Sequence, residues 1–191
     1  VMVLGDGMIG QMMEPVEFKE KTTSRVLPGK TWATTGTKEK RKPNIINSLY
    51  LDPQILENHN LHLNDIYEQI KKDEVRYESI GVEDCDVVCV AYGTTSRIVK
   101  TAIQECEKEG LKVGMIRPIT LWPFPDAAFD KINPKCKGIL CVEMSMGQMI
   151  DDVKIAANGR WKTHFYGRVG GMIPEPDAVK AAIEKIIRGE D

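Results

Sequence analysis

Four short segments of this sequence combine glycines, hydroxyls or a proline with charged side chains, and each follows an apolar run. They are residues 92–97 (YGTTSR), 117–120 (RPIT), 143–145 (EMS) and 167–171 (GRVGG). Such segments suit a small anionic ligand, because Arg side chains and the free N–H groups at the start of a helix attract negative charge. The candidate cofactor-binding residues are Gly93, Thr94, Thr95, Arg97, Arg117, Glu143, Arg168 and Gly170.

The same residues also have a purely structural interpretation. Glycines permit tight turns after strands, Thr and Ser side chains cap helices, and Arg117 can pair with Glu143. Neither GxGxxG nor GxxxxGK[ST] occurs, which argues against dinucleotide and P-loop sites. Ser145 is not in a GxSxG elbow, and no Ser, His and Asp arrangement is evident. We therefore expect no catalytic residue in this chain.

Metal and cluster sites are not indicated either. The carboxylate of Asp6 lies between Gly5 and Gly7, which alone is weak evidence for Mg²⁺. The five cysteines lack the CxxC spacing of iron–sulfur ligands, and their odd number argues against a disulfide framework. The three histidines have no neighbouring ligand pattern. We expect no metal site, and mostly buried free thiols in a reducing cytoplasm.

From residue 75 onward, apolar runs alternate with amphipathic stretches that could position these segments. The predicted strands are residues 75–80 (an edge strand), 86–91, 112–116, 138–142 and 161–165, and the predicted helices are 95–109, 125–132, 146–158 and 176–188. Alternating strands and helices predict an α/β fold with a mostly parallel, doubly wound sheet. In such sheets, ligands bind beyond the carboxyl ends of the strands, where the four segments lie.

The first 74 residues are organised differently. Residues 1–4 read as a strand without a neighbouring partner, and residues 8–16 as a short helix, which together indicate the tail of an earlier domain. Residues 19–42 are rich in Lys, Thr, Gly and Pro and suggest an exposed linker. Residues 53–72 have helical periodicity, with Asp52 as the N-cap and Pro53 at the first helical position.

Composition limits the possible partners. The chain has 191 residues, a net charge of −2, 42% hydrophobic and 28% charged residues, which is typical of a globular protein. No basic stripe predicts nucleic-acid binding. No apolar stretch approaches the ~20 residues of a membrane helix, and no signal peptide is evident, so we expect a cytoplasmic protein that binds neither nucleic acid nor membrane.

Five stretches together resemble the α-type subunit of 2-oxoacid:ferredoxin oxidoreductases. They are residues 3–18 (VLGDGMIGQMMEPVEF), 91–97 (AYGTTSR), 117–125 (RPITLWPFP), 142–149 (VEMSMGQM) and 165–171 (FYGRVGG), in the order found in that family. The first stretch is most similar to the branched-chain, 2-ketoisovalerate type. The Tyr-Pro-Ile-Thr-Pro stretch near the start of family members has no counterpart here, so no catalytic residue of their first domain is carried over.

The resemblance implies a larger enzyme than this chain. Family members decarboxylate a 2-oxoacid on thiamine diphosphate, pass electrons through iron–sulfur clusters to ferredoxin and release an acyl-CoA. The implied partners are a β-type subunit that holds the diphosphate and Mg²⁺, a γ-type subunit, a ferredoxin-like subunit and ferredoxin itself. We expect the chain alone to bind none of these cofactors and to be inactive outside its oligomeric complex.

The resemblance also implies three regions. Residues 1–18 would be the tail of a truncated domain that covers the pyrimidine end of thiamine diphosphate, residues 19–74 a linker with a helical segment, and residues 75–191 a domain resembling the C-terminal domain of transketolase. Its role would be assembly or shaping the CoA entrance. The alternatives are the equivalent domain of another thiamine-dependent enzyme, of 2-oxoglutarate or 2-oxoacid dehydrogenase type, or a purely structural assembly domain.

Overall fold

The computed structural model describes residues 2, 4–5, 7–18, 20, 26 and 28–190. The chain divides into two units, residues 1–64 and 65–191. Helix α2 (Pro53–Asp73) begins in the first unit and ends in the second. No helix in the described part of the chain is both long and apolar enough to cross a membrane.

The first unit contains few regular elements. Helix α1 (Gly7–Gln11) is shorter than the predicted 8–16 and buries none of its residues, and so short a helix has little intrinsic stability. The strand predicted at 1–4 lies partly outside the described residues, while Met2 and Leu4 are in no strand. Residues 28–51 contain turns, with the Asn44 side chain donating to the carbonyls of Thr31 and Ala33 at 2.9 and 3.1 Å.

Helix α2 confirms the helix predicted at residues 53–72, and it ends one residue later than predicted. The Asp52 carboxylate accepts hydrogen bonds from the backbone N–H groups of Gln54 (2.8 Å) and Ile55 (3.2 Å), as an N-cap does. Lys71 and Lys72 lie in its last turn, where positive charge complements the helix dipole.

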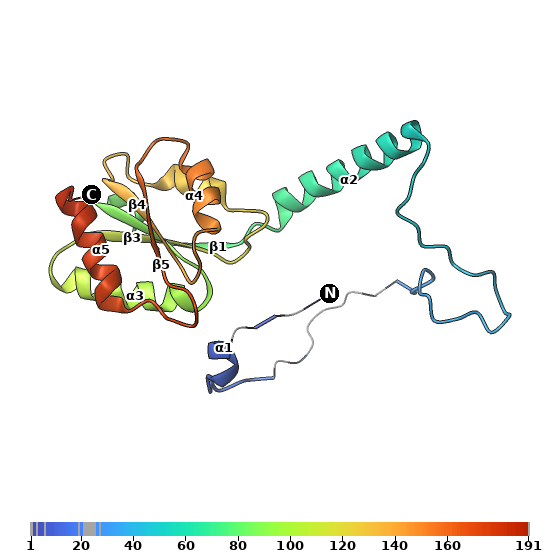
Figure 1. Ribbon diagram of the computed structural model, residues 1–191, viewed down its shortest axis with the longest axis horizontal. Helices are drawn as coiled ribbons and strands as arrows, with labels where there is room; N and C mark the ends of the chain where they lie inside the picture. Colours follow the sequence, from blue (N-terminus) through green and yellow to red (C-terminus); the bar gives the residue numbers. More distant parts are fainter. Residues whose placement is uncertain are drawn as a thin grey trace. The chain divides into compact units, whose positions relative to one another are not determined.

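The second unit is built on one five-stranded sheet with the order β1-β3-β2-β4-β5 (Figure 1). The strands are β1 (Tyr77–Ile80), β2 (Val87–Val90), β3 (Val113–Pro118), β4 (Gly138–Glu143) and β5 (Thr163–Gly167). Strand β1 lies at the edge and runs antiparallel to β3, while the other pairs are parallel. The predicted mostly parallel α/β fold is therefore confirmed.

Helices cover both faces of this sheet. They are α3 (Gly93–Lys108), α4 (Met149–Ala157) and α5 (Pro176–Arg188). Two 3₁₀ turns lie between strands, η1 (Val82–Asp84) between β1 and β2 and η2 (Asp126–Lys131) between β3 and β4. Helices α3 and α5 pack with Cys89 and Leu140 in one core cluster, and α4 and η2 pack with Val88 and Ile139 in the other. Two covered faces explain why every residue of β2 and β4 is buried.

The cysteines also follow the expectation. All five are free thiols, and all five are buried. Cys89 and Cys141 lie within the sheet, Cys106 lies on α3, and Cys85 and Cys136 precede β2 and β4.

Candidate functional site

The carboxyl ends of the parallel strands share one edge of the sheet, as the alternation of strands and helices predicts. Strands β3, β2, β4 and β5 are mutually parallel neighbours, so their carboxyl ends lie along one edge (Figure 1). The loops after β2 and β5 and the start of α3 therefore flank the end of β4. The residue at that end is Glu143, whose side chain is 1% exposed.

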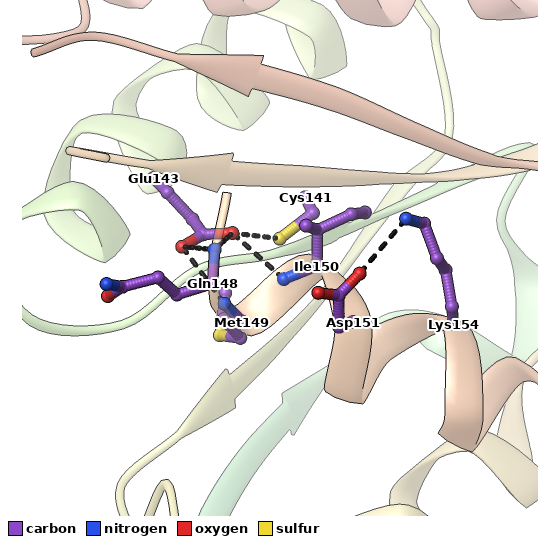
Figure 2. A network of polar contacts seen from close by, with 7 residues as sticks. All are labelled: Cys141, Glu143, Gln148, Met149, Ile150, Asp151 and Lys154. Carbon is purple, nitrogen blue, oxygen red and sulfur yellow. Dashed lines mark hydrogen bonds and ion pairs between the residues drawn. The ribbon is translucent and has the colours of Figure 1, made fainter. Parts of the chain in front are cut away.

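The Glu143 carboxylate closes the N-terminus of helix α4 (Figure 2). Its Oε2 accepts hydrogen bonds from the backbone N–H groups of Gln148 and Met149, both at 3.1 Å, and its Oε1 accepts one from Ile150 at 2.9 Å. The Ser145 hydroxyl donates to Oε2 at 2.9 Å. These donors are among the N–H groups that an α-helix leaves without intrahelical partners.

The electrostatics keep this buried group ionised. Burial alone raises the pKa of Glu143, but the hydrogen bonds from Met149, Gln148, Ser145 and Ile150 more than offset it, so the pKa lies below 4.5. The Cys141 thiol donates to Oε1 at 3.4 Å, and burial together with the Glu143 charge raises the pKa of Cys141. Burial and the same charge raise the pKa of Tyr92.

The Glu143 carboxylate at the N-terminus of α4 limits which ligands can bind there. Glu143 already supplies a negative charge to the first N–H groups of the helix, so an anionic ligand placed there would meet a fixed like charge. The contacts therefore give Glu143 a structural task, and its cofactor-binding role stays a prediction.

Helix α3 begins differently from the prediction. It starts at Gly93, two residues before the expected position, and no side chain caps its N-terminus. Thr95 and Ser96 are buried, and the Ser96 hydroxyl donates to the Gly93 carbonyl at 2.7 Å. The capping role predicted for residues 94–96 is therefore wrong. Gly93 has a φ of 57°, a conformation that favours glycine.

The predicted Arg117–Glu143 pair is also wrong. Arg117 lies within β3, directly opposite Glu78 of β1, and its Nη1 donates to the Glu78 carboxylate at 3.0 Å. Lys100 donates to the other oxygen of Glu78 at 3.0 Å. These contacts, with Lys100 contributing most, lower the pKa of Glu78. Glu78 on the edge strand β1 thus neutralises the charge of Arg117. Arg117 is also separated from Glu143, because β2 lies between β3 and β4.

The remaining candidates lie on the surface of the same edge. Arg168 is half-buried, and its backbone N–H donates to the Glu143 carbonyl at 3.1 Å. Gly170 is exposed with a φ of 66°. Thr94 is half-buried and Arg97 is exposed, both in the first turn of α3. The structure therefore brings Arg168 to Glu143 through their backbones and leaves Arg117 in a separate ion-pair group.

Two residues of this region were not predicted as site residues. Ser145 bonds Glu143 and accepts the Gly147 N–H at 3.0 Å, and Glu78 joins Arg117 to Lys100. The sequence offers one signal for Ser145: it follows by two residues the carboxylate of Glu143 at the end of a predicted strand. In the described part of the chain, no group of three or more His, Cys, Asp and Glu side chains could hold a metal ion.

Comparison with known proteins identifies this arrangement. Residues 85–179 match the family model described as pyruvate:ferredoxin oxidoreductase core domain II. The chain is 38% identical over 186 residues to the ketoisovalerate oxidoreductase subunit VorB of Methanothermobacter marburgensis, covering 97% of this chain and 52% of that protein. The chain thus spans about half the length of the curated relatives that it matches.

Solved structures agree with the sequence relatives. A 2-oxoglutarate:ferredoxin oxidoreductase from Magnetococcus marinus, with 2-oxoglutarate, coenzyme A and succinyl-CoA bound, superimposes with a TM-score of 0.60 and 26% identity over 72% of this chain and 24% of that chain. A split-gene transketolase, an inactive β4 tetramer, has a TM-score of 0.50 and 17% identity over 59% of this chain and 41% of its own, which shows a shared fold.

These matches establish the class first: residues 85–179 belong to the pyruvate:ferredoxin oxidoreductase core domain II family, the chain as a whole is similar to 2-oxoacid:ferredoxin oxidoreductase subunits, and its second unit has the transketolase C-terminal-like fold. Within that class it is more similar to the ketoisovalerate-type subunit, at 38% identity, than to the solved 2-oxoglutarate enzyme, at 26%. The resemblance seen in the sequence motifs is confirmed.

Proposed function

We propose that this chain is part of a cytoplasmic, thiamine-diphosphate-dependent 2-oxoacid:ferredoxin oxidoreductase that converts 2-ketoisovalerate, or a related 2-oxoacid, to an acyl-CoA. The observation that carries the proposal is the 38% identity to a ketoisovalerate oxidoreductase subunit, which extends over 97% of the chain. Thiamine diphosphate, Mg²⁺, CoA and iron–sulfur clusters would act in the intact complex. Electrons would leave through the ferredoxin-like subunit to ferredoxin.

The three regions have separate roles in this proposal. Residues 1–18 would belong to the domain over the pyrimidine end of thiamine diphosphate, and residues 19–74 would connect it to the transketolase C-terminal-like domain of residues 75–191. That last domain would serve assembly with the β-type and γ-type subunits. Its charged strand-end groups favour this role, because Glu143 and Arg117 are each engaged by partners within the chain.

An exposed apolar surface supports the assembly role. Several exposed hydrophobic residues lie beyond β4 and around β5, and five of them are called here the edge patch: Met144, Met146, Phe165, Val169 and Met172. Met146 is 83% exposed and stands between the half-buried residues Ser145 and Gly147. Several exposed apolar residues in loops at one edge of a domain commonly mark an interaction surface. We assign the edge patch to contact with other subunits of the oxidoreductase.

The assembly role predicts that Met146→Ser combined with Val169→Ser weakens the complex. The full subunit carrying both changes should lose about tenfold or more in its association with the β-type subunit, because two apolar contacts are replaced by hydroxyls. The measurement is co-purification and sedimentation of the reconstituted complex. Turnover of 2-ketoisovalerate, pyruvate and 2-oxoglutarate with CoA and ferredoxin is assayed on the same samples.

Ile155→Ser is the matched control, because Ile155 is 73% exposed on α4, outside the edge patch. It should leave both assembly and turnover unchanged. Equal loss of association in the control and the double variant would refute the assembly role. A wild-type complex that turns over pyruvate or 2-oxoglutarate faster than 2-ketoisovalerate would refute the proposed substrate while leaving the family intact.

A second candidate role is the CoA entrance, favoured by the coenzyme A bound in the Magnetococcus marinus relative. If the strand-end loops contact CoA, then CoA should slow backbone hydrogen exchange in residues 92–97 and 167–171 of the intact complex. Arg168→Ala should then raise the KM for CoA with assembly unchanged. Unaltered exchange in both loops at saturating CoA would eliminate this role, and loss of assembly by the variant would favour packing.

A further inference from the structure

Two of the five buried cysteines face each other at the edge of the sheet opposite the strand-end loops. Strands β2 and β4 pair in parallel with Val87 opposite Gly138. The Lys137 N–H donates to the Asp86 carbonyl at 2.7 Å, so the pairing continues toward the amino ends of both strands. One residue further back, Cys85 comes opposite Cys136.

The backbone around the two cysteines is held in place by Asn133. Its backbone N–H donates to the Val82 carbonyl at 2.8 Å, and its side-chain amide donates to the Cys85 carbonyl at 3.1 Å. The Cys136 N–H in turn donates to the Asn133 carbonyl at 2.9 Å. Residues 82–85 and 133–136 are therefore tied together by two hydrogen bonds that involve no sulfur, and a third fixes the turn that carries Cys136.

The two side chains also belong to one core cluster, which contains both Cys85 and Cys136. Each thiol donates to a backbone carbonyl, that of Cys85 to Val82 and that of Cys136 to Gly138, both at 3.2 Å. Neighbouring strands lie about 4.8 Å apart, which is within the Cα separations that disulfides bridge. The other three cysteines, all within the described residues, do not lie opposite one another in the sheet: Cys89 pairs with Leu140, Cys141 pairs with Val90, and Cys106 lies on helix α3.

The surroundings allow a small oxidant to approach. Cys85 is 2% exposed and Cys136 is 7% exposed, but Asp84 and Lys135, next to them in sequence, are exposed. The pair thus lies one residue beneath the surface rather than at the centre of the core. The neighbouring Cys85 side chain is the main cause that lowers the pKa of Cys136, while Cys136 raises the pKa of Cys85, so Cys136 is the more acidic thiol of the pair.

We propose that Cys85 and Cys136 form a reversible disulfide when the protein meets hydrogen peroxide. The Cys136 thiolate attacks one peroxide oxygen, the O–O bond breaks, and a sulfenic acid forms as hydroxide leaves. The Cys85 sulfur then attacks the Cys136 sulfur, its proton goes to the departing hydroxyl group, and water leaves. The two thiols lose two electrons in total, and one peroxide is reduced to two waters.

The disulfide would covalently join β2 to β4 near their amino ends, because Cys85 and Cys136 each lie two residues before the start of these central strands. Its closure of the long segment between the two cysteines predicts a higher thermal unfolding midpoint for the oxidised chain than for the reduced one. The opposite edge, with Glu143 and the edge patch, carries none of the reacting groups.

The test counts thiols in the full chain before and after peroxide treatment. The reduced chain holds five thiols, and after peroxide is removed and the chain is unfolded in an alkylating reagent we expect three, with five restored by dithiothreitol. Cleavage at acidic residues separates Cys85 from Cys89 at Asp86, and cleavage after lysine separates Cys136 from Cys141 at Lys137. The combined digest should release one disulfide-linked pair of peptides, one with Cys85 and the other with Cys136 as its only cysteine. Circular dichroism confirms that the chain stays folded.

Variants provide the control. Cys106→Ala should still lose two thiols, whereas Cys85→Ala and Cys136→Ala should form no disulfide. Retention of all five wild-type thiols, at a peroxide concentration that oxidises the unfolded chain, would overturn the proposal. A disulfide between any other cysteines would overturn it as well. If a variant fails to fold, the thiol count and the disulfide mapping of the wild-type chain are sufficient to test the proposal.

Discussion

Glu143→Gln is expected to destabilise the second unit by about 3 kcal/mol, the cost typical of leaving buried donors without an acceptor. The glutamine keeps the shape of the side chain but replaces one carboxylate oxygen with an NH₂ group. That group would face backbone N–H donors such as Met149 or Ile150, which now bond Oε2 and Oε1. The free energy of unfolding in urea, measured for the full chain, gives the loss directly.

Two neighbouring changes act as controls. Gln148→Ala should cost little, since the hydrogen bond from Gln148 to Glu143 comes from the backbone N–H and the Gln148 side chain is exposed. Ser145→Ala removes a single hydroxyl donor to the carboxylate and should cost about 1 kcal/mol. The capping interpretation fails if Glu143→Gln is no more destabilising than Ser145→Ala.

The pH dependence provides a second measurement of the same cap. The folded-state pKa of Glu143 lies below the unfolded value of 4.5, so the unfolded chain binds the proton first as the pH falls. The carboxylate therefore contributes its full stabilisation above pH 4.5 and loses it as the pH drops through the folded pKa. The difference in unfolding free energy between the wild type and Glu143→Gln should shrink in acid. A constant difference across that range would contradict the ionised cap.

Helix α5 shows why much of the fold could be predicted from the sequence. It was predicted and observed at Pro176–Arg188, because its apolar period, the proline at its first turn and Gly189 after its end are all local signals. Strand β2 was similarly evident as a continuous apolar run. The strand bounds differ by one or two residues, as for β5, which was predicted at 161–165 and observed at Thr163–Gly167.

The candidate site was predictable only in part, because its contacts are not local. Parallel strands place the loops at one edge, which the alternation of elements already indicated. The partner of Arg117 depends on β1, a four-residue edge strand whose antiparallel pairing with β3 brings Glu78 alongside. The cap of α4 comes from Glu143 at the end of the preceding strand, whereas capping signals are sought immediately before a helix. Helix α4 was consequently predicted to begin at residue 146 and begins at Met149.

Gly167→Ala is expected to destabilise the same edge by about 3 kcal/mol, near the upper end of the usual cost of overpacking. Gly167 pairs with Glu143 in the register of β4 and β5. A methyl group on its Cα would meet the Ser145 carbonyl oxygen and would lie only 2.6 Å from Cζ of Phe165. The φ of Gly167 is not positive, so space rather than backbone conformation forbids the side chain.

Gly138→Ala is the comparison for Gly167→Ala, because its new methyl group would meet side chains that can move and not a backbone atom that cannot. The methyl group at residue 138 would meet Nε2 of His164 at 2.9 Å and Cγ2 of Ile186 at 3.1 Å, and both are side-chain atoms that can shift. We expect about 1 kcal/mol for this variant. Adding Phe165→Ala to Gly167→Ala should recover little stability, because the Ser145 carbonyl stays in place. Full recovery in that double variant would show that the ring, and not the loop that begins after Glu143, limits the packing at this edge.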